Sequence, residues 1–328
     1  MKTSLILVMF AAVAFIGVVA LALAIALGGP AQPAPMRSMS RPFESVDFSG
    51  VSDARRFAAR DGAQLAYRAY AAAEQPARGS VVLIHGSSSR SVSVHPLAAG
   101  LARAGYSVYA LDMRGHGESG VKGQIAYVGQ LDDDVEDFVK TVLPAGRKTL
   151  IGFSSGGGFA LRFAGGPKAA VFDAYLLLAP FIHQDAPTAK AGAGGWAAVG
   201  VPRIVALTIL NGIGITAFND LPVIAYALGE EEGKFLTPWY SYALATNFRP
   251  RFDYRADIVA VAQPMEVVAG ADDEVFFADR YESLFAQAGH PVRVTIVPGL
   301  GHIEMVLHPA AAEAAVSALK RLDRQRGR

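Results

Sequence analysis

The sequence predicts an α/β fold in which a mostly parallel sheet is flanked by helices, with one transmembrane helix at the N-terminus. Three observations predict it. Strand-like apolar runs alternate with helix-like segments over residues 80–179 and again over 265–322. The first of these runs, at 80–84, is a continuous apolar run, as expected for a parallel strand covered on both faces. A separate stretch of 23 residues, Leu5–Leu27, carries no charge and is long enough to cross a bilayer.

The composition excludes several classes of protein. The 328 residues include 30 Lys and Arg against 29 Asp and Glu, a formal net charge of +1, and no cysteine. A nearly neutral chain is a poor match for nucleic acid, which binds basic surfaces. The lack of cysteine excludes disulfides, thiolate nucleophiles, cysteine-ligated zinc and iron–sulfur clusters. With 52% hydrophobic and 18% charged residues, the chain is not a disordered polymer.

Residues 1–28 are predicted to form a single-pass membrane anchor. As a helix, Leu5–Leu27 would be about 35 Å long, which exceeds the roughly 30 Å of a hydrocarbon core. A cleaved signal peptide is the first alternative, since Ala24-Ile25-Ala26 could serve as its cleavage site. A buried core helix is the second, although such helices seldom lack a polar face over so many residues.

The charges around this span favour, on balance, a globular part outside the cytoplasm. Lys2 and the α-amino group favour a cytoplasmic N-terminus, whereas Arg37 and Arg41 behind the span favour the opposite orientation. Residues 29–53 are expected to be a proline-rich linker. Its prolines and small residues indicate an extended spacer that lifts the domain off the bilayer.

Residues 54–180 are predicted to form the first part of the core. They begin with a hairpin around Asp61-Gly62. A continuous apolar run predicts a strand at 80–84, and further strands are predicted at 106–111, 148–153 and 174–179. The intervening segments predict helices at 96–104, 128–143 and 155–164. The acidic residues of 128–143 lie mostly off its apolar stripe, so we expect them to form a solvated face.

Residues 251–328 complete the core with strands at 265–269 and 292–297 and helices at 276–288 and 309–322. Between the two parts, residues 181–250 break the alternation. They are rich in glycine and alanine and contain both tryptophans. We expect this segment to be a helical cap insertion over the sheet. Sites in such folds lie at the carboxyl ends of the strands.

A candidate nucleophile stands at one of these strand ends. Gly152-Phe153-Ser154-Ser155-Gly156 fits G-x-S-x-G at the join of a predicted strand and helix. The glycines of this motif let strand and helix approach closely, and the serine sits on a strained turn that exposes its hydroxyl. Ser155 does not fit this frame, because Phe153 rather than glycine precedes it by two residues. A glycine-rich turn of no function is the alternative.

An acid and a histidine follow two further strands. Gly270-Ala271-Asp272-Asp273-Glu274 comes directly after the strand at 265–269, and His302 follows the strand at 292–297 and a turn. A serine nucleophile needs a base, and the base needs a carboxylate that fixes its tautomer. Three such residues at three strand ends therefore predict a Ser–acid–His triad.

The chain resembles the α/β-hydrolases, in which the nucleophile, acid and histidine follow this chain order. His85-Gly86-Ser87 is similar to the HG oxyanion motif of these enzymes, and Asp112–Ser119 is similar to their D-x-R-G-H-G-x-S loop. That loop is common in the serine aminopeptidase-like branch, which contains lysophospholipases and monoacylglycerol lipases. The resemblance covers about residues 57–179 and 264–322, and the insertion corresponds by position to the cap.

The resemblance implies a role for each candidate. Ser154 would be the nucleophile, His302 the general base and then acid, and Asp273 the orienting carboxylate, because the family places its acid three residues after the glycine that ends the strand. Asp272 is the second choice for the acid and Glu274 the third. The backbone N–H groups of Ser87 and Ser155 would bind the oxyanion. His85 and His116 are expected to be structural.

The implied function is that of a serine hydrolase that cleaves carboxylic esters through an acyl-enzyme on Ser154. Apolar cap segments at 202–210 and 221–228, together with the anchor, favour a lipid-like ester such as a lysophospholipid or a monoacylglycerol. A peptidase, amidase or transacylase would use the same triad. The alternative of another class is a non-catalytic, membrane-anchored interaction domain. We expect no cofactor and no metal, and the oligomeric state is left open.

Overall fold

The computed structural model describes residues 2–36, 41–192 and 195–325. Its centre is an eight-stranded sheet with the strand order β1-β2-β4-β3-β5-β6-β10-β11. From β4 to β11 all neighbours in the sheet are parallel, and β2 joins β4 in antiparallel fashion at one side. The predicted mostly parallel sheet is therefore confirmed. The strands are β1 (Ala54–Ala58), β2 (Gln64–Tyr70), β3 (Ser80–Ile84), β4 (Ser107–Leu111), β5 (Lys148–Phe153), β6 (Ala174–Leu178), β10 (Met265–Gly270) and β11 (Arg293–Val297).

Helices cover both faces of this sheet. Side chains that alternate along β3 fall into two separate hydrophobic clusters, because successive residues of a strand point to opposite faces. One cluster includes α3 (His95–Arg103), α11 (Glu304–Leu307) and α12 (Pro309–Gln325). The other includes α4 (Gln130–Thr141), α5 (Ser155–Ala164), α9 (Tyr254–Ala260) and α10 (Tyr281–Gln287). Short 3₁₀ helices lie at Arg41–Ser45, Ser91–Val94, Ala169–Val171 and Ala278–Arg280.

The acidic residues of α4 are not simply a solvated face. Asp134 is buried, and its carboxylate lies 2.7 Å from the guanidinium of Arg114. Asp133 and Glu136 both pair with Lys168. The expectation of a solvated face is therefore wrong for Asp134. Its position on the apolar side of α4 is explained by Arg114, which lies in the loop after β4 and whose charge compensates the buried carboxylate.

The insertion over residues 181–250 is a mixed cap. It contains α6 (Val201–Gly212), α7 (Glu230–Phe235) and α8 (Tyr242–Asn247), and also an antiparallel sheet in the order β7-β8-β9. These strands are β7 (Ala197–Val199), β8 (Pro222–Tyr226) and β9 (Trp239–Ser241). The expectation of a helical cap is thus incomplete, because apolar runs as short as these do not distinguish a strand from a turn of helix.

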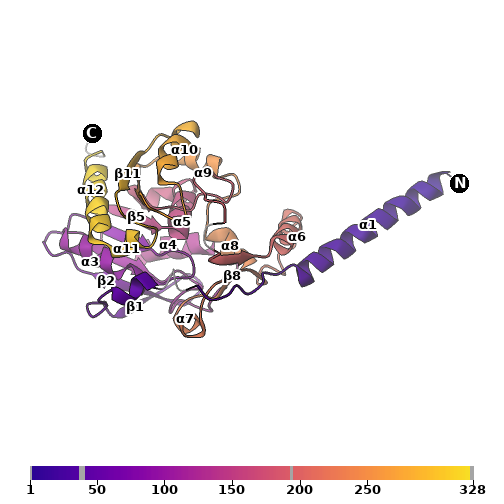
Figure 1. The fold of residues 1–328 in the computed structure, drawn as a ribbon, viewed down its shortest axis with the longest axis horizontal. Coiled ribbons are helices and arrows are strands. Elements are labelled where there is room, and N and C mark those ends of the chain that lie inside the picture. Colours follow the sequence, from indigo (N-terminus) through magenta and orange to yellow (C-terminus); the bar gives the residue numbers. More distant parts are fainter. Residues whose placement is uncertain (1, 37–40, 193–194, 326–328) are drawn as a thin grey trace.

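The N-terminal helix α1 (Lys2–Leu27) projects away from the rest of the molecule, and its C-terminal end lies beside α6 (Figure 1). Over Met9–Leu27 its mean hydropathy is 2.8, and none of that stretch is buried. By length and composition this helix fits a membrane anchor, and a signal sequence has the same properties.

The expected spacer behind α1 packs against the cap instead of standing free. The backbone N–H of Met36 donates to the carbonyl of Ala227 at 2.8 Å, and the Gln32 side chain donates to the carbonyl of Tyr226 at 3.1 Å. Proline keeps such a segment extended, as the sequence predicts. An extended segment exposes its backbone groups, and here the carbonyl of Ala227, just after β8, is the partner of one of them, the Met36 N–H.

Candidate active site

Ser154 lies on the sharp turn between β5 and α5. Its backbone has φ 54° and ψ −119°, a strained conformation for a residue with a side chain. Two glycines make the turn possible. A Cβ on Gly152 would lie 2.1 Å from the carbonyl oxygen of Gly156, and one on Gly156 would lie 2.3 Å from that of His85. Neither position has room for any side chain.

Replacing Gly156 by alanine is therefore expected to lower the free energy of unfolding by about 3 kcal/mol, because the new methyl group meets backbone rather than a movable side chain. Gly233→Ala is the matched control. It lies within α7, where a new methyl group would meet no other atom within 4 Å, so it should leave stability equal or slightly higher. Urea unfolding of the detergent-solubilised chain measures both. Equal stability of the two variants would contradict the close backbone packing at the turn between β5 and α5.

The side chains of Ser154, His302 and Asp273 are linked in this order by two hydrogen bonds, here called the hydrogen-bonded chain. Ser154 Oγ lies 3.0 Å from His302 Nε2, and His302 Nδ1 lies 2.8 Å from Asp273 Oδ2. All three residues are buried, with exposed fractions of 8%, 3% and 1%. They follow β5, β11 and β10, whose carboxyl ends lie at one edge of the sheet. With Nδ1 protonated, Nε2 is left as an acceptor for the serine hydroxyl.

Local hydrogen bonds fix the acid and the histidine. The other carboxylate oxygen of Asp273, Oδ1, accepts from the backbone N–H groups of Val275 and Phe276, each at 2.8 Å. Glu274 accepts from the backbone N–H of His302 at 2.9 Å. Asp272, the second choice for the acid, is exposed. The structure thus brings Asp273 to the histidine ring and leaves Asp272 in solvent.

The two residues expected to supply oxyanion donors flank Ser154. Ser87 and Ser155 both line the same cavity as Ser154. Within the described part of the chain, neither backbone N–H donates a hydrogen bond. Ser155 is the first residue of α5, where backbone N–H groups have no partner inside the helix. Both N–H groups are therefore available to a negatively charged oxygen.

The cap supplies a residue that the sequence did not suggest. Tyr240 in β9 accepts a hydrogen bond from the backbone N–H of Ser88 at 2.6 Å, and its hydroxyl lies 2.6 Å from His116 Nε2. Burial, and then the neighbouring His85 ring, hold the pKa of His116 well below its ordinary value. The neutral ring accepts from the tyrosine hydroxyl. Tyr240 thereby joins the loop after β3, the loop after β4 and the cap.

A cavity of about 1560 Å³ opens over Ser154 and His302. Most of its wall is apolar, with side chains such as Phe181, Val223 and Val306. The charged side chains in the wall are Arg90, Lys190, Glu232, Arg249 and Glu274. A cavity of this kind suits an apolar ligand that presents one polar group to the serine.

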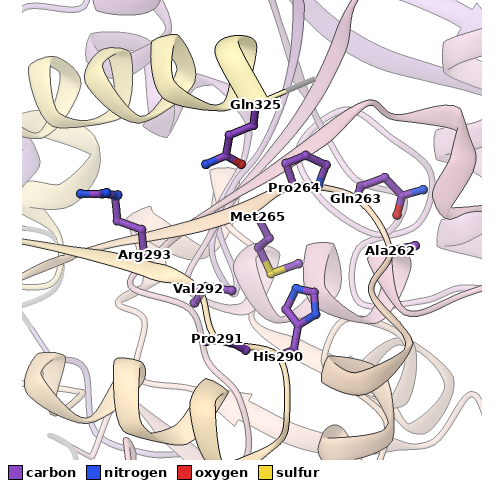
Figure 2. Close-up of a pocket in the computed structure, with 9 residues that line it drawn as sticks. All are labelled: Ala262, Gln263, Pro264, Met265, His290, Pro291, Val292, Arg293 and Gln325. Atoms are coloured by element: carbon purple, nitrogen blue, oxygen red, sulfur yellow. The ribbon is translucent and has the colours of Figure 1, made fainter. Parts of the chain in front are cut away.

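A smaller cavity of about 330 Å³ lies at the amino ends of β10 and β11, and Figure 2 shows the residues that line it. It is lined by Met265 and Arg293, the first residues of β10 and β11, and by His290, so it is remote from the carboxyl ends of the strands. Among the residues that the structure describes, no group of three or more His, Asp or Glu could hold a metal ion.

The fold and the hydrogen-bonded Ser–His–Asp chain at the strand ends are those of an α/β-hydrolase. The sequence profile of the serine aminopeptidase S33 family matches residues 75–306. The chain therefore belongs to this hydrolase family, and the resemblance seen in the sequence is confirmed.

Relatives and solved structures agree with this assignment. A monoacylglycerol lipase of Mycolicibacterium smegmatis is 32% identical over 142 residues, which are 41% of this chain and about half (49%) of the relative. A soluble variant of monoglyceride lipase from Saccharomyces cerevisiae has a TM-score of 0.61 at 17% identity, over 84% of this chain and 96% of that one. A bacterial membrane phospholipase A has a TM-score of 0.56 at 17% identity, over 98% and 99%. At these identities the two structures show a shared fold.

Proposed function

We propose that the chain is a membrane-anchored serine hydrolase that cleaves carboxylic esters of lipid-like acyl groups. One observation carries the proposal: the hydrogen-bonded chain of Ser154, His302 and Asp273 lies in the wall of a large, mostly apolar cavity. The monoacylglycerol lipase of M. smegmatis supports the same substrate class. A monoacylglycerol or a lysophospholipid has the required chemistry, an ester next to a single long apolar chain.

The geometry suits acyl transfer through an acyl-enzyme. His302 Nε2 takes the proton of Ser154 as Oγ attacks the acyl carbonyl, and Asp273 stabilises the imidazolium that forms. The N–H groups of Ser87 and Ser155 bind the oxyanion. The imidazolium then gives its proton to the leaving alcohol, and water attacks the acyl-enzyme with His302 as base. The products are the free acid and the alcohol, and Ser154 is regenerated.

The same proposal takes α1 to be a retained anchor. Leu21 and Ile25 of α1 pack against the apolar cluster around Leu207 of α6, a contact that a cleaved signal sequence would remove. Lys2, which precedes the span, favours a cytoplasmic N-terminus and hence a domain on the other side of the membrane. An anchor holds the cavity beside its lipid substrate.

The test is hydrolysis by the purified full chain of nitrophenyl esters from acetyl to palmitoyl, followed by a monoacylglycerol, a lysophospholipid and aminoacyl nitroanilides. We expect a maximum at medium or long acyl chains and no cleavage of the anilides. Labelling by a fluorophosphonate reports the reactive serine independently of the substrate. Cleavage of anilides alone would make the protein a peptidase. No hydrolysis and no labelling in a folded protein would make it a binding domain.

Tyr240 is proposed to position the oxyanion loop, the loop after β3 that carries Ser87 and Ser88. Without its hydroxyl, the Ser88 N–H and the His116 Nε2 lose their buried partner, which costs about 1–3 kcal/mol. Tyr240→Phe is thus expected to lower kcat for the best ester about tenfold with little change in KM. Tyr127→Phe, at an exposed tyrosine, is the control. A change in KM alone would show that Tyr240 shapes the cavity rather than the oxyanion loop.

A further inference from the structure

The chain that follows α1 contributes to the cavity from two sides. On the cap side, Met36 is fixed by its backbone hydrogen bond to Ala227 and lines the cavity. On the core side, Phe43 packs against the hydrophobic cluster of α3, α11 and α12, and the ring of Phe48 lies 6.2 Å from that of His95. Phe43 and Phe48 line the same cavity. Three apolar side chains from outside the family profile, which starts at residue 75, thus complete its wall.

Arg203 fixes the end of α1 to the cap. From α6, its guanidinium donates to the carbonyls of Ile25 and Ala26 at 2.7 and 3.1 Å, and to the carbonyl of Pro222 in β8 at 2.8 Å. The last carbonyls of a helix have no partner inside it and carry partial negative charge, so a guanidinium there is favourable. One side chain therefore connects α1 to α6 and β8.

Close backbone contact continues this attachment beyond the helix. Gly200, just before α6, has the carbonyl oxygen of Gly28 at 2.7 Å from the position of a Cβ. The N–H of Arg203 donates to the same carbonyl at 3.3 Å. The start of the segment thus lies against the beginning of α6, and Met36 at its far end is hydrogen-bonded to Ala227, the residue just after β8. The cap thus fixes both ends of residues 28–36.

We infer that residues 28–36 and 41–48 form a specificity-determining wall of the acyl site. The contact of Arg203 with α1 holds its first part, residues 28–36, and the packing of Phe43 and Phe48 on the core holds the second. This inference rests on the proposed function and goes beyond it. Selection among acyl chains is then a property of the anchored protein, because the wall is positioned by the same helix that enters the membrane. The side chains that contact the acyl chain and so select its length are Met36, Phe43 and Phe48.

The first test uses the full chain in phosphatidylcholine nanodiscs and the ratio of kcat/KM for dodecanoyl and acetyl nitrophenyl esters. Met36→Ala and Phe43→Ala are each expected to lower this ratio fivefold to tenfold, because only the long chain reaches the wall. Arg203→Gln is expected to lower it as well, and Arg203→Lys to restore only part of it, since the compact ammonium lacks the three separate nitrogens with which the planar guanidinium meets the three carbonyls. Phe218→Ala is the matched control, because Phe218 is exposed outside the cavity. An unchanged ratio in all variants overturns the inference.

A second test separates this inference from the proposed function. Trp196 lines the cavity, and the chain has one other tryptophan, Trp239. In a Ser154→Ala, Trp239→Phe background, the fluorescence of Trp196 reports binding of dodecanoate without turnover. We expect Met36→Ala to weaken this binding about fivefold. Weakened binding by the Met36→Ala variant, together with no esterase activity in the chain that retains Ser154, refutes the function and supports the wall. Esterase activity with unchanged dodecanoate binding supports the function and refutes the wall.

Discussion

Replacing Ser154 by alanine is expected to lower kcat/KM for ester hydrolysis by about 10³-fold or more, and to abolish fluorophosphonate labelling. The hydroxyl lies 3.0 Å from His302 Nε2, and no other hydroxyl in the described chain shares that contact. The rate that remains would come from substrate binding and the oxyanion donors. Stability should change little, because alanine and serine meet the same strain at φ 54°.

Ser155→Ala is the matched variant for this experiment. Ser155 is expected to contribute its backbone N–H and not its hydroxyl, so the variant should retain at least about one-tenth of the activity and all of the labelling. If Ser155→Ala removed the labelling and Ser154→Ala did not, the assignment of the nucleophile within the G-x-S-x-G motif would be wrong.

Asp273→Asn is expected to lower kcat by about 10³- to 10⁴-fold. Oδ1 of Asp273 already accepts from the N–H groups of Val275 and Phe276, so an asparagine would direct its carbonyl oxygen there and its NH₂ toward His302. An NH₂ donor at Nδ1 forces the proton onto Nε2. The ring could then no longer accept the proton of Ser154.

Asp272→Asn is the control, since Asp272 is adjacent in sequence and exposed. Its kcat should stay within about twofold of the unaltered protein. Steady-state kinetics at saturating ester measure both variants, and circular dichroism checks that each is folded. A larger loss in Asp272→Asn than in Asp273→Asn would reverse the choice of acid.

Much of the core could be predicted from the sequence because its signals are local. The strands at 80–84 and 148–153 coincide with β3 and β5, since strands covered on both faces are mostly apolar and end at a change of composition. The helix at 155–164 coincides with α5. The positions of Ser154, Asp273 and His302 could be predicted from these strands, because each residue lies in the connection that follows a strand.

The remaining features depend on partners far away in the chain. Tyr240 and Ser88 are 152 positions apart, and nothing near either residue indicates that contact. Asp134 lies on the apolar side of α4 only because Arg114 reaches it from another loop. The strands of the cap have three to five residues, too few for a periodic pattern. The segment behind α1 has the composition of a free linker, and its contacts with Tyr226 and Ala227 of the cap are made with residues about 190 positions further along the chain.

If α1 is the proposed membrane anchor, its contact with α6 limits how deeply the protein sits in a bilayer. Leu21 and Ile25 pack on α6, so that part of the helix is beside the cap. The apolar stretch before it, Leu5–Ala20, is about 24 Å long at 1.5 Å per residue, shorter than a hydrocarbon core of about 30 Å. In the anchored protein, this hydrophobic mismatch would be relieved by local thinning of the bilayer or by immersion of α6 in its interfacial layer. Val205 and Ile209, exposed on α6 and part of the cavity wall, would then touch lipid directly.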